Sequence, residues 1–419
     1  MPNPQTPNEA ENWTVLFQEI TDAFSPGAPI QERELFAGRV NELQGLMDAV
    51  GQRGRHAVLF GERGVGKTSM VNIFPLTVIS SAKQVLAVRV NSAPDESFTS
   101  LWKKVFKRFS YAAENGQPSR KIADDFAGEI TPDDVQLALE EFEDNVIPIV
   151  ILDEFDRIEN KSVTRQVADT IKALSDYSVN VTVVVVGVAE SVAALIEGHE
   201  SISRSLLHVK MPRMSQDELA DIVVKRYKKC GISTSGDILW KITFLSRGLP
   251  YYTHILAMYA ARSAVNQKRK VVIESDLKDA IRIAISDIDQ TIRERYLSAT
   301  ISQRREEALF EPVLLACALA ASDELGRFQQ SAVAEPLNKI VPGKNYEAST
   351  FAFHMNEFTT EKRKNVLERL GETRNYRYRF TDPMMQPFVI LKGIHDERVT
   401  EELAELFEPK RQLRLSIDF

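Results

Sequence analysis

The chain has 419 residues, a formal net charge of −7 and a pI near 5.6, with 43% hydrophobic and 26% charged residues. This length exceeds what one hydrophobic core usually organises, and the acidic balance excludes a global basic field that would attract nucleic acid, so only a local basic surface could do so. The two cysteines, Cys230 and Cys317, lie far apart without CxxC spacing, which favours reduced structural thiols over a disulfide framework or a cysteine metal site.

Residues 1–30 are polar and proline-containing, and we expect them to form a partly ordered arm. One amphipathic stretch in this arm, "NWTVLFQEITDAF", is suited to a short helix. The start of the chain lacks the basic and apolar regions of a secretory signal, and the longest strongly apolar run, at 181–189, is about half of a membrane-spanning helix. We therefore expect a cytoplasmic protein with no membrane partner.

From residue 56 onward, apolar runs of strand length alternate with amphipathic segments of helical length. Several of these runs are apolar on both faces, as strands covered by helices on both sides must be. The pattern predicts an α/β domain over residues 31–213 that is built on a parallel sheet. Its expected strands are 56–61, 84–90, 147–155, 181–188 and 206–211.

After Pro212 the pattern becomes helical, beginning with a capping box formed by Ser215 and Glu218. We expect a helical lid domain over 214–298. A third region, 299–396, reads as three helices followed by an alternating segment that breaks at Asp382-Pro383 and then turns apolar again. Three helices and then a β-ribbon is the chain order of a winged helix. The tail, 397–419, combines a short amphipathic helix with alternating apolar residues, which suit packing on its own domain or addition to a sheet edge.

The stretch "GERGVGKTS" has the GxxxxGK[ST] spacing of a loop that cradles phosphates. It follows an apolar strand and opens a helix, so its backbone N–H groups and the helix N-terminus would face phosphate oxygens. By this logic Lys67 reaches the β- and γ-phosphates and Thr68 offers its hydroxyl to Mg²⁺. The alternative is a glycine turn that matches by chance. The expected nucleotide-binding residues of this loop are Gly61, Glu62, Arg63, Gly64, Val65, Gly66, Lys67, Thr68 and Ser69.

A second constellation, "IVILDEFD" at 149–156, places two acids at the carboxyl end of an apolar strand. Burying Asp153 there is costly unless it meets a cation, and Mg²⁺ held through a water supplies one. The neighbouring Glu154 is placed to activate an attacking water as a general base, which predicts hydrolysis as well as binding. A solvated charged turn is the alternative, but it does not explain why the acids end so apolar a strand.

The remaining motifs favour ATP as the nucleotide. No NKxD-type motif for guanine follows a later strand, where the chain instead reads "VAESVAAL". A small-molecule kinase would carry an arginine-rich lid after the third strand, and none is visible, although a kinase stays as a minor alternative.

The segment "LFAGRVNELQGLMDAVGQRGRHAVLFGERGVGKTSM", with the order of motifs that follows it, resembles AAA+ ATPases of the origin-recognition and initiator group, and is similar to prokaryotic STAND-type ATPases. The resemblance covers most of residues 30–395. It implies an α/β P-loop NTPase of the ASCE or AAA+ type, a helical lid and a C-terminal winged helix. It also implies that Phe36, Arg39 and Glu42 lie beside the adenine.

The same resemblance implies further site residues, with departures from the family pattern. Where such enzymes carry a polar sensor after the fourth strand, this chain offers Ser191, which we favour over Glu190 because a glutamate would repel a γ-phosphate. Arg204 stands where an arginine that reaches a neighbouring subunit's ATP is expected; a surface arginine is the alternative. The triplet "GLP" resembles the STAND lid, whose proline, here Pro250, contacts the nucleotide. These departures predict a slow or partner-stimulated switch.

Between residues 361 and 379 seven Lys or Arg stand against three Glu, on the expected final helix and first wing strand. Such elements touch the grooves and phosphates of double-stranded DNA in DNA-binding winged helices. The alternatives are a solvated face, an intramolecular clamp or a protein dock. The candidate DNA contacts are Lys362, Lys364, Arg374, Arg377 and Arg379.

These patterns together predict a Mg²⁺-dependent ATPase that acts as a conformational or assembly switch. We expect it to self-associate through its ATPase domain or to bind a protein partner, and to contact DNA through the winged helix. The alternative is a STAND-like signalling or defence ATPase that engages a protein instead of DNA.

Overall fold

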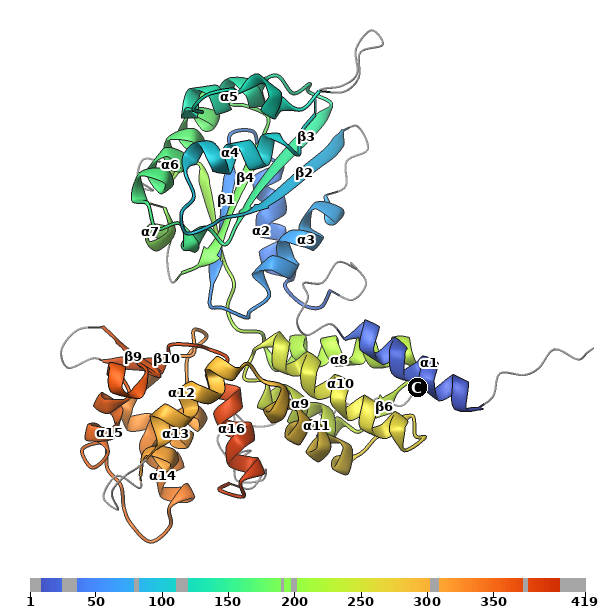
Figure 1. Cartoon of the computed structure of the whole chain (residues 1–419), viewed down its shortest axis with the longest axis vertical. Coiled ribbons are helices and arrows are strands. Elements are labelled where there is room, and N and C mark those ends of the chain that lie inside the picture. The colour runs from blue at the N-terminus through green and yellow to red at the C-terminus, as the bar shows by residue number, and fades with distance from the viewer. Residues whose placement is uncertain are drawn as a thin grey trace, which may run out of the picture. The chain divides into compact units, whose positions relative to one another are not determined.

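A computed structural model describes residues 9–24, 36–78, 83–110, 120–189, 192–196, 202–301, 309–371 and 376–399. The chain forms two compact units (Figure 1). The first unit comprises Pro29–Glu62 and Gly66–Pro212, and the second comprises Met1–Ala28, Arg63–Val65 and Arg213–Phe419. Residues 400–419, most of the expected tail, lie outside the described residues. None of the helices in the described part of the chain is long and apolar enough to cross a membrane.

A five-stranded parallel sheet in the order β2-β3-β4-β1-β5 forms the centre of the first unit. Every residue of the interior strand β1 is buried, whereas the edge strand β2 is partly exposed along its length. The predicted parallel α/β fold is therefore confirmed, and each expected strand lies within a few residues of its observed position. The strands are β1 (His56–Gly61), β2 (Gln84–Asn91), β3 (Val146–Asp153), β4 (Thr182–Val188) and β5 (Leu206–Lys210).

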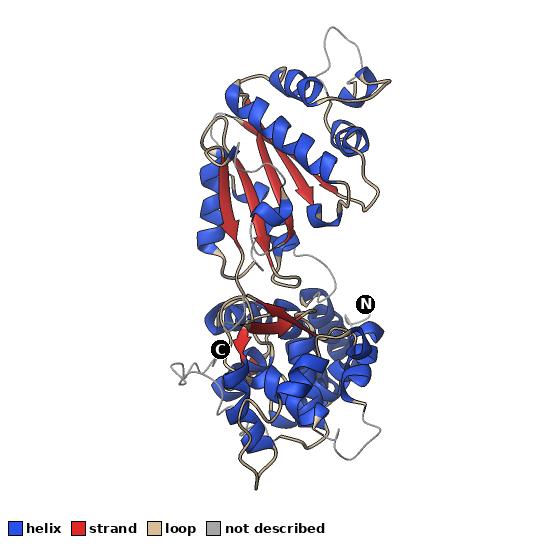
Figure 2. Ribbon diagram, turned by 90° about the vertical axis from the view of Figure 1, so that its left-hand side faces the viewer, coloured by secondary structure: helices blue, strands red, loops and turns tan. Residues whose placement is uncertain are grey.

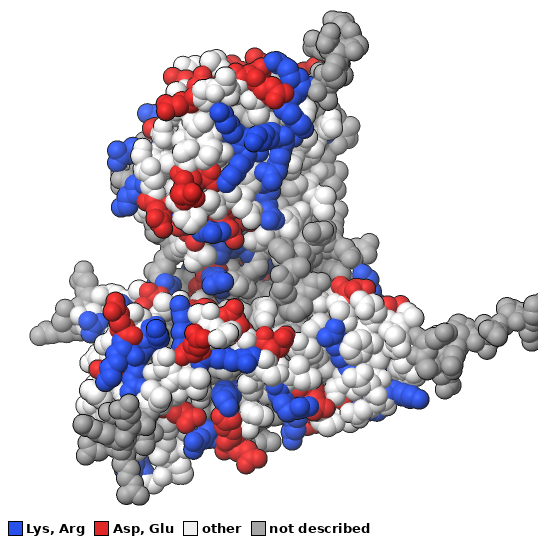
Figure 3. All heavy atoms as spheres, in the orientation of Figure 1, with Lys and Arg blue, Asp and Glu red and all other residues white. Residues whose placement is uncertain are grey.

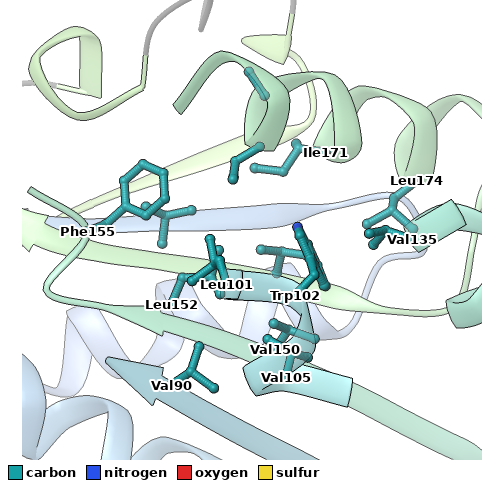
Figure 4. Close-up of a cluster of buried hydrophobic side chains, with 14 of the residues drawn as sticks. Val90, Leu101, Trp102, Val105, Val135, Val150, Leu152, Phe155, Ile171 and Leu174 are labelled. Atoms are coloured by element: carbon teal, nitrogen blue, oxygen red, sulfur yellow. The ribbon is translucent and has the colours of Figure 1, made fainter. Parts of the chain in front are cut away.

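Helices cover both faces of this sheet, so neighbouring residues of one strand enter two different cores (Figure 2). On one face, Val150 and Leu152 of β3 pack with Trp102 of α4 and Ile171 of α6 (Figure 4). Helices α2 and α3 contact the strands from the sheet's other face. The helices are α2 (Val40–Val50), α3 (Lys67–Thr77), α4 (Phe98–Phe106), α5 (Pro132–Glu140), α6 (Lys161–Asp176) and α7 (Val192–Leu195), with 3₁₀ turns η2 (Ile122–Asp125) and η3 (Phe155–Arg157).

Helices dominate the first part of the second unit. The predicted capping box begins α8: the Ser215 hydroxyl accepts from the Glu218 amide at 3.3 Å, and the Glu218 carboxylate accepts from the Ser215 amide at 2.9 Å. Gly231 ends this helix in the left-handed conformation, with φ of 63°. The elements are α8 (Gln216–Cys230), β6 (Ser233–Thr234), α9 (Gly236–Leu245), α10 (Pro250–Asn266), β7 (Val271–Val272) and α11 (Glu274–Asp287).

The N-terminal helix α1 (Glu9–Ala23) also belongs to this unit, where it packs against α8 and α10. Its end is anchored by Arg226, which is 1% exposed and donates from Nε to the Ala23 carbonyl at 3.0 Å. The Phe24 ring meets Tyr227 and His254 edge-on. Part of the segment expected as a partly ordered arm is thus a helix that completes the core of the lid.

The C-terminal region has the helix and strand order of a winged helix, with a three-stranded sheet in the order β8-β10-β9. Two details of the prediction were wrong. The last of the three helices, α15, stops at Glu357, and residues 367–370, expected as helix, form a strand that pairs with β10. Its elements are α12 (Gln290–Thr300), α13 (Phe310–Leu319), β8 (Phe328–Gln329), η6 (Gln330–Val333), α14 (Ala334–Ile340), α15 (Ala352–Glu357), η7 (Glu361–Arg363), β9 (Leu367–Leu370), β10 (Arg377–Phe380) and α16 (Met385–His395).

The second wrong detail concerns the segment after Asp382-Pro383, for which the sequence pattern predicts part of the β-ribbon. It forms the helix α16, because its apolar residues Val389, Ile390 and Leu391 are all buried against neighbouring helices, notably α13. Pro387 lies in the first turn, where a missing N–H costs no helical hydrogen bond. A short apolar run alone does not distinguish a buried strand from a buried helix.

Candidate nucleotide-binding site

The two sequence motifs meet at one edge of the parallel sheet, where all strands end. In the register, Gly61 at the end of β1 pairs with Val188 of β4, and Asp153 at the end of β3 pairs with Asn91 of β2. Ligands of open α/β sheets bind at the carboxyl ends of the strands. The sheet therefore brings the phosphate loop and the acidic pair to the same edge.

The phosphate loop leaves β1 in a conformation that needs glycine. Gly64 and Gly66 have φ of 85° and 95°, in the left-handed region, where a Cβ is disfavoured. A Cβ at Gly61 would overlap the carbonyl oxygen of Met211. Helix α3 begins directly after Gly66, so the loop places the positive end of an 11-residue helix toward its own concave side.

Lys67 is held inside the loop that precedes it. Lys67 is only 8% exposed, and its Nζ donates to the carbonyls of Gly61 at 3.0 Å and Glu62 at 2.7 Å. These carbonyls keep the buried ammonium solvated by the protein, which an isolated buried charge requires. That this ammonium binds a phosphate stays a prediction from the spacing of the loop.

Asp153 is buried, being 3% exposed. Burial raises the pKa of its carboxyl, while the Glu154 amide, Arg89 and the nearby Thr68 hydroxyl act to lower it. Oδ1 accepts from the Glu154 amide at 2.9 Å, but Oδ2 accepts no hydrogen bond of normal length within the described residues. A buried carboxylate oxygen that accepts no hydrogen bond, beside a threonine hydroxyl, is the kind of oxygen donor that Mg²⁺ prefers. The residues present therefore fit the expected metal ion.

Glu154 follows Asp153 in a strained backbone conformation, with φ of 55° and ψ of 36°. Non-glycine residues in this region are uncommon and cluster at functional sites. The turn directs the Glu154 side chain outward, where it is 44% exposed and pairs with Arg157 at 2.8 Å. An exposed pair of this kind is worth little, so the carboxylate can exchange Arg157 for another partner at small cost.

Two residues at this edge escaped the sequence prediction. Arg89 of β2 reaches across the strand ends, with Nε 3.7 Å from Asp153 Oδ2. Asp156 accepts from the Val188 amide at 2.8 Å and so joins the acidic motif to the end of β4. The only signal for Arg89 was a charged residue near the end of an otherwise apolar strand.

The residues expected beside the adenine and the phosphates are placed unevenly. Phe36 is half-buried. Arg39 is buried and makes protein contacts, donating to the Pro212 carbonyl at 2.7 Å and pairing with Glu42 at 3.2 Å. Arg204 is exposed on the turn that precedes β5.

The other expected ligands lie in different parts of the chain or outside the described residues. Ser191 and Glu190 lie outside the described residues. Pro250 is the first residue of α10 and belongs to the second unit. Within the loop, Glu62 and Val65 are buried, Arg63 is exposed, and Gly66, Thr68 and Ser69 are half-buried.

The basic residues of the C-terminal region do not form the predicted surface on a final helix. Arg377 pairs with Asp323 at 2.9 Å, Arg379 with Glu368, and Lys362 with Glu357 at 3.5 Å. Lys364 is exposed in a turn, and Arg374 lies outside the described residues. Several of the expected positive charges are thus neutralised by carboxylates of the same unit.

Comparison with known proteins gives one family and several structural likenesses. A family model described as novel STAND NTPase 1 matches residues 28–269. A search of curated proteins finds no match. Among solved structures, Pyrobaculum aerophilum Cdc6p is 14% identical, with 90% of this chain and 98% of that chain covered and a TM-score of 0.43.

Two further solved structures have similar values. The Aeropyrum pernix ORC2 protein is 13% identical, with 92% and 97% of the two chains covered and a TM-score of 0.48. A Walker-type ATPase of Pyrococcus abyssi is 14% identical, with 88% and 99% covered and a TM-score of 0.48. Scores this low support no inference about activity or partners.

Proposed function

The chain belongs to the novel STAND NTPase 1 family, as its resemblance to STAND-type ATPases predicted, and from this premise we propose that it is a Mg²⁺-dependent ATPase working as a conformational switch. The observation that supports this most is the end of the sheet where the Thr68 hydroxyl lies beside Asp153 and the buried Lys67 precedes Thr68 in the loop. A lysine in the phosphate loop, a hydroxyl and a buried carboxylate with an oxygen that accepts no hydrogen bond are suited to hold a nucleoside triphosphate with its metal.

In this proposal the chain's own residues divide the work. Lys67 and the loop amides hold the phosphates, and Thr68 and Asp153 hold Mg²⁺, which when bound neutralises charge on the β- and γ-phosphates. Glu154 leaves Arg157 and accepts a proton from the attacking water. Arg204, exposed before β5, extends to the ATP of a neighbouring copy and stabilises the charge that develops there.

Glu154→Gln is the substitution that tests this assignment. The amide keeps the size of the side chain but cannot accept the proton, so we expect Mg-ATP to bind with unchanged affinity while phosphate release slows about 100-fold or more. Calorimetric titration measures the first quantity and a phosphate-release assay the second. Lys67→Ala, in contrast, should abolish nucleotide binding itself.

Glu159→Gln provides the matched control, because Glu159 is an exposed glutamate shortly after the motif. This variant should hydrolyse ATP at the normal rate. Rapid turnover by Glu154→Gln would refute Glu154 as the base, and normal ATP affinity in Lys67→Ala would refute the phosphate loop as the nucleotide site.

The target of the switch has two candidates. We propose DNA contact through the C-terminal region, supported by exposed Lys364 and by the winged-helix order of its elements. A protein partner is the second candidate, favoured by the ion pairs that neutralise Arg377 and Arg379 and by the STAND family match. Self-association through the first unit, Pro29–Glu62 and Gly66–Pro212, which we call the ATPase unit, suits either target. The cytoplasmic location stays a prediction.

A further inference from the structure

The ATPase unit contains a polar cavity next to the candidate nucleotide site. Its volume is about 730 Å³, and it is lined by Asn72 of α3, Arg89 and Asn91 at the end of β2, and Lys104 and Arg108 from α4 and the turn after it. All five side chains carry N–H donors, and three of them are cationic. This lining is that of a site for an anion with several oxygen atoms.

The donors of this cavity are held in place by the protein around them. Arg89 pairs with Asp153 and donates to Asn72, and its second terminal nitrogen lies 3.5 Å from Asn91 Oδ1. Lys104 pairs with the buried Glu96. Among the described residues, the Arg108 side chain has no hydrogen-bond or ion-pair partner. The cavity therefore keeps an uncompensated guanidinium at its rim.

The cavity continues into a basic stripe at the end of α4 and in the turn after it, defined by Lys103, Lys104, Lys107 and Arg108. The opposite face of this helix packs into the core through Leu101, Trp102 and Val105, so the basic residues face outward. Lys103 and Lys104 lie in the last turn of α4, and Lys107 and Arg108, both exposed, follow in the turn after it. Figure 3 shows Lys and Arg side chains gathered over α4 and β2.

This stripe differs from the basic segment 361–379 because few acidic residues lie near enough to neutralise it. Residues 98–109 contain no Asp or Glu. The carboxylates that pair with the cavity's cations are Glu96 and Asp153, and both are buried. In a chain with a net charge of −7, an outward row of four cations is a local exception that favours a polyanionic partner.

We propose that the basic stripe of α4 and the adjoining cavity bind the phosphate backbone of double-stranded nucleic acid. Arginine, lysine and asparagine side chains are typical donors to phosphate oxygens, and a cluster of four cations at a helix end and the following turn suits neighbouring phosphates. No aromatic side chain lines the cavity, so it lacks the stacking platforms that bind single strands. The site is separate from the proposed winged-helix contact.

Lys107→Glu with Arg108→Glu tests the proposal, because neither side chain has a hydrogen-bond or ion-pair partner among the described residues and both lie outside the nucleotide site. Binding of the full chain to a labelled duplex of about 30 base pairs is measured at several salt concentrations, with Mg-ATP present. We expect affinity to fall about tenfold or more, and the slope of log K against log salt to shrink by about 2, roughly one unit per lost phosphate contact.

Lys161→Glu with Lys172→Glu on α6 is the matched control, because it changes net charge equally on two exposed lysines of the same unit. This control should bind the duplex nearly as the unchanged chain does. Nucleotide affinity, measured in parallel, should be normal in both variants, so failure of this proposal is distinct from failure of the ATPase proposal. Lys362→Ala with Lys364→Ala tests the winged-helix contact in the same titration.

Three outcomes would overturn the proposal. The first is duplex affinity and salt slope that are unchanged in the α4 variant. The second is absence of duplex binding by the unchanged chain at low salt. The third is binding of poly-glutamate or of a single strand of the same length as tightly as the duplex, with the same dependence on Lys107 and Arg108, because it would assign the stripe to another class of polyanion.

Discussion

Acidification should destabilise the unit that contains the parallel sheet through one histidine at the start of its interior strand β1. His56 is 0% exposed, and its Nδ1 accepts from the Val183 amide at 3.0 Å. Because Nδ1 is the acceptor, the proton of the neutral ring lies on Nε2. Burial lowers the pKa of His56 from 6.5 to about 3. The folded unit therefore keeps this histidine neutral at pH values where the unfolded chain protonates it.

The sign and size follow from linkage. A depressed folded-state pKa of a base means that the unfolded state binds more protons, so stability is fully present above the unfolded pKa of 6.5 and is lost as pH falls from there toward 3. Lowering the pH from about 7.5 to about 5.5 should remove about 1.4 kcal/mol, and a pH of about 5 should remove about 2 kcal/mol. At a urea m-value of about 2 kcal/mol/M, the first loss shifts the midpoint by about 0.7 M.

The chain offers a clean optical readout for this unit. Of its three tryptophans, Trp102 lies in the core of the ATPase unit, whereas Trp13 and Trp240 belong to the other unit. In a Trp13→Phe and Trp240→Phe background, fluorescence reports the unfolding around Trp102. Urea titrations at the two pH values then measure the ATPase unit within the full chain. His254, whose pKa is also lowered to about 3 by burial, lies in the other unit and contributes little to this signal.

His56→Asn is the comparison variant, because its amide oxygen can accept from Val183 but does not titrate. The expected result is that the variant loses about 1.4 kcal/mol less than the unchanged chain between the two pH values. This difference cancels contributions from the carboxylates, which both chains share. Equal losses in the two chains would refute the reasoning.

Two further substitutions test the packing. Gly61→Ala should destabilise the ATPase unit by about 2–4 kcal/mol, because its Cβ would overlap the Met211 carbonyl. Gly51→Ala is the control and should be tolerated, because Gly51 has a helical φ of −69°. Equal urea midpoints for the two variants would contradict this expectation. Arg226→Ala should destabilise the lid by about 2–4 kcal/mol and release α1, seen as faster amide hydrogen exchange along α1. Lys225→Ala, one position away on a half-buried lysine that pairs with Asp221, should leave that exchange slow.

The sequence predicted the parts of the fold that depend on local pattern. The five strands, their parallel arrangement and the capping box at Ser215 follow from hydrophobic periodicity and from residue preferences over short ranges. That the phosphate loop and Asp153 lie at the same end of the sheet was also predictable, because parallel strands must all end there.

The parts that could not be predicted depend on contacts between distant segments. Arg89 looks unremarkable within its strand, and only the β2–β3 register brings it to Asp153. The sequence predicts a basic surface around Arg377 because it does not reveal that this side chain pairs with Asp323, 54 positions away. The segment 384–395 was misread because its apolar run is equally suited to a buried strand.

Helix α1 also has a consequence for the order in which the protein folds during synthesis. Its apolar face, including Leu16 and Ile20, with Phe24 directly after the helix, is buried and packs against α8 and α10, and α10 begins at Pro250. The whole ATPase unit is translated in between, so at about 5–20 residues per second the face waits roughly 10–50 seconds for its partner. During that interval the apolar face of α1 is uncovered in the nascent chain. We expect a chaperone or the ribosome surface to cover it.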